Sequence, residues 1–381
     1  MLRLETTSLN FISIGMRSNV TLFFGIIFSL VESLHTNIVQ ISILMGTAPI
    51  IWGMTSLIMP RLMSKFSLYQ IILVAAWTLA LSAVFRLFGG TFPLFFFTLT
   101  LNIGIGILNI SIPAWVKQIA PNRTDLLLGR HYKIMLLASG CSIIMAVAIL
   151  DTGNHWKWAF APWLVPSLIG ASLLIFVPER LTAQSAEVSV TKSYQSANGA
   201  GLSTFILFFG IQGVASHAFG VWSPSIMIDF GFSTLNSAIV CAMLTIVGAF
   251  LASKLLSQQL SQAALQKCFK IASLLLFVGY IQILSKQVLI FSLGLFLVFC
   301  SQGIIFLIGL ISITRWSNDV SQVLAASSKI QGWGYVLTGF GPICVGLIRQ
   351  SQGSWEACIY FMIFCTLGLY ITGLKTLRSE S

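Results

Sequence analysis

The chain is a succession of long apolar runs separated by short polar breaks, and this pattern restricts the fold more than any other feature. A bilayer-spanning α-helix needs about 20 mostly apolar residues. Runs close to this length predict about twelve crossings. They lie at 9–31, 37–59, 69–89, 91–115, 125–150, 157–177, 202–227, 234–256, 267–285, 288–312, 321–347 and 355–375. The sequence therefore predicts an all-α integral membrane protein.

The scarcity of charge supports the same conclusion. Of 381 residues, 56% are hydrophobic and only 8% are charged, whereas about a quarter of the residues in a typical soluble domain are charged. So few charges cannot solvate a surface of this size in water, and we expect the lipid bilayer to cover most of it. Glu5 and Arg17 interrupt the apolar core that a cleavable signal would need, so the first run is expected to remain as a helix.

The basic residues indicate the orientation in the membrane. The net charge is +11, but the cations are scattered between apolar runs and do not form the basic patch of a nucleic-acid-binding protein. Cytoplasmic loops of membrane proteins are enriched in Lys and Arg, so we expect both termini on the cytoplasmic side of the cell inner membrane. The segments then assigned to the cytoplasm hold Arg3, Arg61, Lys65, Lys117, Arg123, Arg130, Arg180, Lys192, Lys254, Lys267, Lys270, Arg315, Lys375 and Arg378, and those assigned to the outside hold only Arg86, Lys157, Lys286 and Arg349.

One long hydrophilic segment divides the chain. Residues 178–201 (PERLTAQSAEVSVTKSYQSANGAG) are rich in Ser, Ala, Thr and Gln and lack a helical period, which is typical of a linker. We predict a six-helix bundle at 1–177, a cytoplasmic linker at 178–201 and a second six-helix bundle at 202–381. This layout resembles that of the major facilitator transporters, in which substrate binds near the bilayer midplane between two such halves.

Enzyme chemistry finds no support in the sequence. It contains no P-loop, HExxH or GxSxG motif, and Gly104 and Gly106 lack the third glycine and the strand of a dinucleotide site. The seven cysteines form no CxxC pair and no metal-ligand spacing with histidine. We expect no enzyme activity, no cofactor and no metal. A non-transporting membrane receptor is a further alternative, but no sizeable soluble output domain is present.

Arg17 is the most informative candidate for a binding residue. It lies about eight residues into the first helix, roughly 12 Å deep at 1.5 Å per residue. A charge at such a depth costs at least ~2.5–3.5 kcal/mol and is normally turned toward protein or a water-filled cavity. Asn10, Ser13, Arg17 and Thr21 recur at helical spacing and form one polar stripe. We predict that Arg17 binds an anionic or strongly polar group of a substrate; the alternative is a structural arginine satisfied by backbone carbonyls and Asn19.

Other polar residues within the apolar runs extend the candidate substrate site. Lys133 either lines the cavity or extends its long side chain to the membrane surface. For Lys329 we expect a position in the cavity. Any single polar residue in these helices can instead form a hydrogen bond between helices. The predicted substrate-binding set is Arg17, Thr21, Asn109, Lys133, Gln212, Ser216, His217, Trp222, Lys329, Gln331 and Tyr335.

Carboxylates are conspicuously rare in the predicted spans. Glu32, Asp151, Asp229 and Glu356 all fall near helix ends. Proton-coupled transport usually uses a titratable group in the pathway, and His217, followed by His131, is the candidate here. A cation-lined cavity without carboxylates favours an anionic or electron-rich substrate over a cationic drug.

Several motifs resemble those of the cyanate permease and 2-nitroimidazole transporter branch of the major facilitators. They are GMRSN at 15–19, GIGILNISIPAWVK at 104–117, WSP at 222–224 followed by Asp229, QGWGY at 331–335 and GSW at 353–355. The resemblance implies that Arg17 and Gln331 lie along a central cavity. Ser18 replaces the family proline, and 60–65 (PRLMSK) carries only a degraded form of the gating motif.

These observations predict a monomeric secondary active transporter with a small-molecule substrate. We expect it to move a small anion or polar organic solute by alternating access, with a proton as the candidate coupling ion. The alternative within the same fold is efflux of neutral or amphipathic toxic compounds. In that alternative Trp222, Trp333 and Tyr335 would dominate recognition, and Arg17 would be structural.

Overall fold

The computed structural model describes residues 2–120, 123–177, 201–256, 260–315 and 320–378, and these form helices joined by short turns, with no strand among them. The predicted linker at 178–201 lies almost entirely outside the described residues. Because lipid cannot satisfy backbone N–H and C=O groups, apolar segments of this length fold as helices that satisfy their own backbone. The helices are α1 (Leu2–Thr21), α2 (Phe23–Ser33), α3 (Ile38–Met63), α4 (Leu68–Phe85), η1 (Arg86–Phe88), α5 (Thr91–Ile119), α6 (Thr124–Asp151), η3 (Trp156–Ala159), η4 (Ala161–Trp163), α7 (Leu164–Ile175), α9 (Leu202–Asp229), α10 (Thr234–Leu256), α11 (Gln262–Ile283), α12 (Val288–Thr314), α13 (Val320–Thr338), α14 (Phe340–Gln352) and α15 (Trp355–Arg378).

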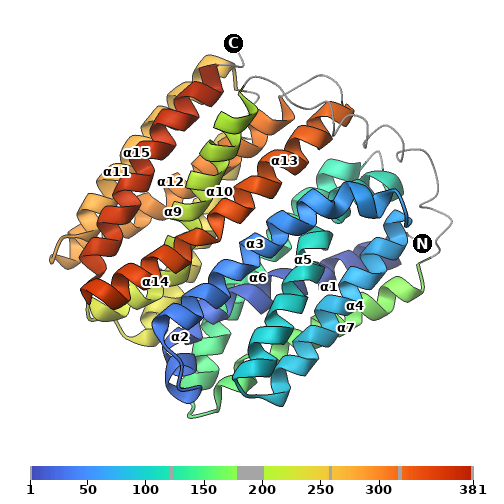
Figure 1. The fold of residues 1–381 in the computed structure, drawn as a ribbon, viewed down its shortest axis with the longest axis horizontal. Coiled ribbons are helices and arrows are strands. Elements are labelled where there is room, and N and C mark those ends of the chain that lie inside the picture. Colours follow the sequence, from blue (N-terminus) through green and yellow to red (C-terminus); the bar gives the residue numbers. More distant parts are fainter. Residues whose placement is uncertain (1, 121–122, 178–200, 257–259, 316–319, 379–381) are drawn as a thin grey trace. The chain divides into compact units, whose positions relative to one another are not determined.

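The predicted membrane fold is confirmed. Among the described residues, 11 helices are long and apolar enough to cross a membrane. The predicted run at 321–347 corresponds to two helices, α13 and α14, which meet at Gly339. The cause is Pro342, because its ring removes the N–H that would bond to the carbonyl of Thr338, and clashes with that carbonyl. α14 nevertheless continues in the direction of α13 (Figure 1).

The first predicted helix is also interrupted. α1 ends at Thr21 and α2 begins at Phe23, with Leu22 between them. Local backbone bonds run from Leu22 N to Ser18 O at 3.2 Å and from Gly25 N to Leu22 O at 3.2 Å. The second of these spans three residues instead of four, so the α-helical ladder shifts its register at this point. The break lies one turn beyond Arg17.

The contacts divide the chain into two compact units. The first consists of Met1–Asn37, Thr47–Thr191 and Thr234–Ala242, and the second of Ile38–Gly46, Lys192–Ser233 and Met243–Ser381. The start of α3 therefore groups with the second unit, and the start of α10 groups with the first. In the first unit, Ile143 and Val147 of α6 form one hydrophobic cluster with Ala238 of α10.

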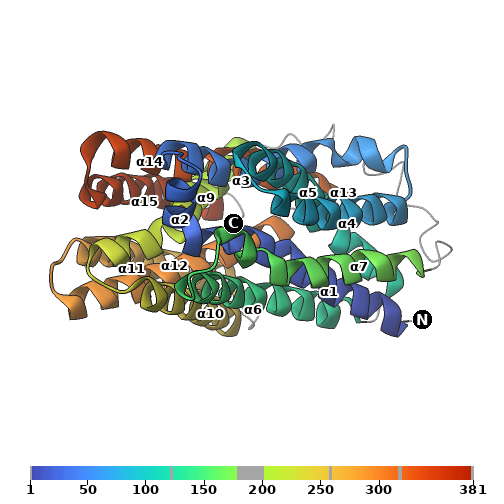
Figure 2. The same cartoon turned by 90° about the horizontal axis from the view of Figure 1, so that it is seen from below.

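Close helix packing in the first unit depends on glycine. α4 and α5 lie side by side (Figure 1, Figure 2). A Cβ atom at Gly104 of α5 would lie 2.7 Å from the carbonyl oxygen of Ala75 and 3.0 Å from the amide nitrogen of Leu79, both in α4. Only a residue without a side chain permits this approach. The helix α1 packs against α6 and α7.

The second unit is built around α9, which packs against α13, α14 and α15. A Cβ atom at Gly334 of α13 would lie 2.6 Å from the Phe209 ring of α9. A Cβ at Gly210 of α9 would in turn lie 2.6 Å from the side chain of Leu337. Glycines on both helices therefore allow α9 and α13 to pack closely.

Candidate functional site

The polar stripe of α1 forms as predicted from its spacing, but its members differ in exposure. Arg17 and Asn10 are half-buried, whereas Ser13 and Thr21 are buried with 0% and 3% of their surface exposed. Arg17 therefore lies at the edge of the buried part of this face. The two hydroxyl side chains on either side of it face the interior of the first unit.

The hydroxyl of Thr21 is engaged with α6. Its oxygen lies 2.7 Å from Ser142 Oγ, and it is within hydrogen-bond distance of the carbonyl oxygens of Arg17 (2.9 Å) and Ser139 (3.3 Å). These contacts hold α1 against α6, the role that polar residues commonly serve between membrane helices. Its place in a substrate site stays a prediction.

His131 of α6 forms a second polar contact with α1. Its ring Nδ1 lies 2.6 Å from Ser13 Oγ, and the serine hydroxyl also lies 2.5 Å from the carbonyl oxygen of Leu9. Only 2% of His131 is exposed. If the serine donates to the carbonyl, the histidine must carry its proton on Nδ1. This buried pair lies one turn from Arg17 along α1.

The remaining candidates of the first unit lie apart from these contacts. The side chain of Lys133 in α6 is exposed, and Asn109 in α5 is half-buried. Exposure of Lys133 fits the snorkelling alternative better than a buried cavity position.

Four candidates of the second unit lie on α9. Gln212 is buried, while Ser216 and His217 are half-buried. The His217 ring Nε2 lies 3.4 Å from the carbonyl oxygen of Met45, in the part of α3 that groups with this unit. Trp222 is fully buried, so its ring belongs to the core of the unit.

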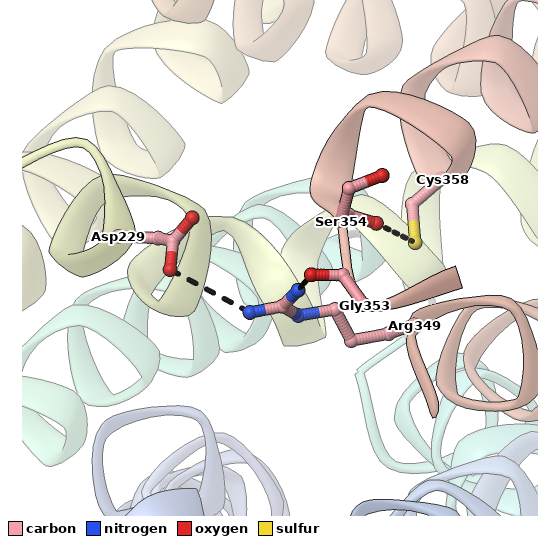
Figure 3. Close-up of polar contacts among 5 residues, drawn as sticks. All are labelled: Asp229, Arg349, Gly353, Ser354 and Cys358. Atoms are coloured by element: carbon pink, nitrogen blue, oxygen red, sulfur yellow. Dashed lines mark hydrogen bonds and ion pairs between the residues drawn. The ribbon is translucent and has the colours of Figure 1, made fainter. Parts of the chain in front are cut away.

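Trp222 is held by two contacts near the end of α9. Its Nε1 lies 3.4 Å from the carbonyl oxygen of Pro342, and its ring lies 5.6 Å from that of Trp355. Arg349 lies over the Trp355 ring, 4.9 Å from the ring centroid. Figure 3 shows the Arg349 guanidinium between the Asp229 carboxylate and the carbonyl of Gly353.

Three candidates lie on α13, and all are half-buried: Lys329, Gln331 and Tyr335. The Gln331 side chain donates to Ser327 Oγ at 2.6 Å. The Tyr335 ring packs edge-on against Phe209 of α9, with centroids 5.5 Å apart. The candidates of α9 and α13 thus lie on two helices that pack together within the second unit, and their union in one site stays a prediction. Trp333, in contrast, is 52% exposed.

Two charged residues are more deeply buried than their sequence positions suggest. Glu5 in the first turns of α1 is 2% exposed, and its Oε1 has no hydrogen-bond partner among the described residues. Arg86, which the sequence places in a break between helices, is 0% exposed. Charged residues near the ends of helices are normally solvated, so the sequence does not indicate that Glu5 or Arg86 is buried.

The fold thus defines a polytopic helical membrane protein with polar and cationic side chains on its spanning helices. The Major Facilitator Superfamily model matches residues 7–299. The chain belongs to this superfamily.

Curated relatives agree with this assignment. The chain is similar to "Uncharacterized transporter YycB" of Bacillus subtilis (strain 168), with 24% identity over 94% of this chain and 89% of the relative. It is similar to the "2-nitroimidazole transporter" of Escherichia coli (strain K12), with 23% identity over 79% of this chain and 75% of the relative. It is also similar to "Cyanate transport protein CynX" of Escherichia coli (strain K12), with 21% identity over 72% and 71%.

Solved structures share the fold at low identity. A D-xylose-proton symporter superposes with a TM-score of 0.72 and 14% identity, over 98% of this chain and 97% of the other. The nucleoside transporter NupG superposes with a TM-score of 0.73 and 11% identity, over 99% of this chain and 100% of the other. The predicted family resemblance is confirmed, and the protein is a multi-pass membrane transporter, not an enzyme.

Proposed function

We propose that this transporter moves a small anion or a polar organic compound by alternating access between two six-helix halves, 1–177 and 202–381. The observation that carries the proposal is the position of Arg17. It lies on a spanning helix of a major facilitator protein, and its side chain is only half-buried. A guanidinium presents planar donors that match carboxylate-like and other oxyanion groups in a bidentate way.

The distribution of acidic residues supports an electron-rich substrate. Glu32, Asp151, Asp229 and Glu356 are exposed, each in the first or last turns of its helix. Glu5 is the described carboxylate that is buried, and it lies 12 residues before Arg17 in α1, a rise of about 18 Å. A cationic substrate would lack a described carboxylate near Arg17, whereas an anion would meet a guanidinium.

Binding can be tested on the purified protein in detergent. Sodium cyanate and 2-nitroimidazole are suitable probes, because they represent a small anion and a neutral heterocycle. A ligand at 100 times its Kd stabilises the folded protein by about 2.7 kcal/mol. We expect cyanate or a comparable small anion to raise the unfolding temperature of the unmodified protein and of Lys133→Gln, and to have much less effect on Arg17→Ala.

The outcome separates the two modes of recognition. If 2-nitroimidazole stabilises the unmodified protein and Arg17→Ala equally, and no anion stabilises either, recognition is neutral and Arg17 is structural. Uptake of labelled probe into vesicles, with Arg17→Ala incorporated at the same level, provides the transport measurement. Normal uptake by that variant would refute the assigned role of Arg17.

Proton coupling is the second part of the proposal. His217 and His131 are the candidate titratable groups, and each lies in a spanning helix within hydrogen-bond distance of a polar atom. Uptake measured with and without an imposed proton gradient tests the coupling. We expect His217→Gln to abolish the effect of the gradient, with His131→Gln as the comparison; a gradient effect that survives both substitutions excludes these residues.

The proposal also fixes an orientation, with both termini in the cytoplasm of a bacterial-type cell and the chain in the inner membrane. The excess of Lys and Arg in the segments assigned to the cytoplasm supports it. Cysteine labelling with a membrane-impermeant reagent at exposed Arg3 and exposed Asn154 would distinguish the two orientations. Labelling of position 154 but not of position 3 in intact cells is expected.

A further inference from the structure

Arg86 has an unusual environment for a cation. It is the first residue of η1 and the C-cap of α4, and its side chain is completely buried. Its Nη1 donates to the carbonyl oxygen of Asn19 at 3.1 Å, and its Nη2 donates to Asn19 Oδ1. Both oxygens of one α1 residue are therefore held by one guanidinium.

Aromatic rings enclose the same guanidinium. Its central carbon lies 4.6 Å from the ring centroid of Phe160 and 5.8 Å from that of Phe23. The two rings pack edge-on, with centroids 5.2 Å apart. A desolvated cation is attracted to the faces of such rings. Phe160 lies between η3 and η4, and Phe23 begins α2, so the contact joins three segments of the first unit to the end of α4.

Arg86 forms no ion pair with a carboxylate among the described residues, although an isolated buried charge is strongly unfavourable. Two helix ends compensate for it. Asn19 lies in the last turn of α1, and Arg86 itself caps α4. The C-terminal end of a helix carries the equivalent of about half a negative charge. The fold thus replaces a counterion with carbonyl oxygens, helix ends and ring faces.

Hydrogen bonds of Asn19 and its partner Ser167 also connect the Arg86 contact to α7 and η4. Its Nδ2 donates to the carbonyl oxygen of Gly15 at 2.8 Å and to Ser167 Oγ at 3.1 Å. Ser167 in turn donates to the carbonyl oxygen of Trp163 at 2.7 Å. Both polar atoms of the Asn19 side chain form hydrogen bonds, so this one residue anchors the last turn of α1 to its neighbours.

The helical geometry connects this residue to Arg17. At 3.6 residues per turn, a residue and the second residue after it differ by about 200° in direction and by about 3 Å in height along the helix axis. Asn19 and Arg17 therefore project from nearly opposite sides of α1. The Asn19 side is held by Arg86, and the opposite side presents Arg17.

We infer that Arg86 is a positioning residue for transport: by holding both oxygens of Asn19 at the break between α1 and α2, it fixes the place and direction of Arg17. This inference rests on the proposed function, in which Arg17 binds the substrate. Arg86 itself contacts no substrate. Its loss is expected to weaken substrate binding by releasing α1 at the break.

The second unit offers a matched control. Arg349 also lies over a ring of an aromatic pair, Trp355 and Trp222, and also donates to a backbone carbonyl, that of Gly353 (Figure 3). Its side chain is 21% exposed and pairs with Asp229 at 3.5 Å. Arg349 therefore shares the ring and carbonyl contacts of Arg86, and among the described residues it forms no contact with α1.

The position of α1 can be measured without knowledge of the substrate. Spin labels at Thr7 of α1 and at Phe88, which ends η1, are both at exposed positions and report on α1 relative to the end of α4. In a cysteine-free background, we expect Arg86→Gln and Asn19→Ala to shift or broaden the distance distribution between them, and Arg349→Gln to leave it unchanged. An unchanged distribution in monodisperse Arg86→Gln protein overturns the inference.

The kinetic test distinguishes positioning from general support of the fold. With labelled cyanate or 2-nitroimidazole, whichever the unmodified protein transports, Arg86→Gln is expected to raise the apparent KM by about 10- to 100-fold while a measurable maximal rate remains. Arg86→Lys keeps the charge, but an ammonium group lacks the two parallel donors that hold both Asn19 oxygens, so the KM of this variant should be intermediate. The double variant Arg86→Gln/Asn19→Ala should be no worse than either single variant.

Failure of this inference differs from failure of the proposed function. A shifted distance distribution with an unchanged KM means that Arg86 only supports the fold, and this result overturns the inference while the role of Arg17 stands. If the distribution shifts but Arg17→Ala binds both probes normally, the proposed function fails, and the inference fails with it because Arg86 then positions no binding residue. If neither probe is bound or transported, an unchanged distribution still overturns the inference, and a shifted one supports its structural half.

Discussion

Gly104 provides a quantitative test of the helix packing in the first unit. A methyl group at this position would approach the backbone of α4, with 2.7 Å to the Ala75 carbonyl oxygen and 3.0 Å to the Leu79 amide nitrogen. Backbone atoms in a helix cannot rotate away as the end of a flexible side chain can. The substitution Gly104→Ala therefore forces α4 and α5 apart, and overpacking of this kind typically costs about 1–3 kcal/mol.

Two other glycines serve as internal controls. A methyl group at Gly309 of α12 would lie 3.4 Å from the nearest atom, in the Phe208 ring, and one at Gly129 of α6 would meet nothing within 4 Å. All three substitutions gain helix propensity, up to about 1 kcal/mol. Because this gain is shared, the difference between Gly104→Ala and Gly129→Ala isolates the steric cost, about 1–3 kcal/mol.

The assay is thermal unfolding of the purified variants in one detergent, followed by intrinsic tryptophan fluorescence. At an unfolding entropy of about 2.1 cal/mol/K per residue, a difference of 1–3 kcal/mol corresponds to about 1–4 °C in a chain of this length. We expect Gly104→Ala to unfold below the parent protein, with Gly309→Ala and Gly129→Ala at or above it. Equal unfolding temperatures for Gly104→Ala and Gly129→Ala would refute the close approach of α4 and α5.

Two further predictions concern polar contacts. Ser13→Ala removes the partner of the buried His131 ring nitrogen, and it should lower the free energy of unfolding by about 1–3 kcal/mol, the typical effect of leaving a buried polar group unsatisfied. The control is Ser64→Ala at an exposed position, which loses only a bond to Arg61 O and should be near neutral. Equal losses of stability in thermal unfolding would contradict the buried contact. Asp229→Asn breaks the 3.5 Å pair with Arg349, in which Asp229 is 58% exposed, and should cost only about 0.2–1 kcal/mol. The loss should shrink as salt rises, and a loss that is independent of ionic strength would show that the pair is more buried than the structure indicates.

The architecture of this protein could be predicted from its sequence because the bilayer imposes a simple requirement. A helix must be apolar over the thickness of the hydrocarbon, and the resulting runs can be located directly in the sequence. A proline inside a helix disrupts the backbone hydrogen bonds that precede it, and the structure interrupts the helix at Gly339, three residues before Pro342. These features depend on one segment at a time, so a single sequence contains the information.

The state of individual polar side chains could not be predicted in the same way, because it depends on which helices are neighbours. Thr21 has the spacing of a cavity residue, yet its hydroxyl bonds across to α6. Lys133 lies well within a predicted helix, yet its side chain is exposed. Trp222 was predicted as a substrate contact, and the structure places its ring in the core of the second unit. Periodicity gives the face of a helix but not the element that covers that face.

The contrast between Arg17 and Arg86 extends this argument to charge. The sequence places Arg17 deep in a span and Arg86 in a break, but the structure leaves Arg17 half-buried and buries Arg86 completely. Arg86 is compensated by carbonyl oxygens and ring faces that belong to the fold and cannot be displaced. The chain has 21 Lys and Arg and only 10 Asp and Glu, and at the buried Arg86 these fixed groups take the place of a carboxylate. Fixed dipoles compensate a buried cation without a carboxylate, which would repel an anion, so this way of burying Arg86 is compatible with the proposed binding of an electron-rich substrate at Arg17.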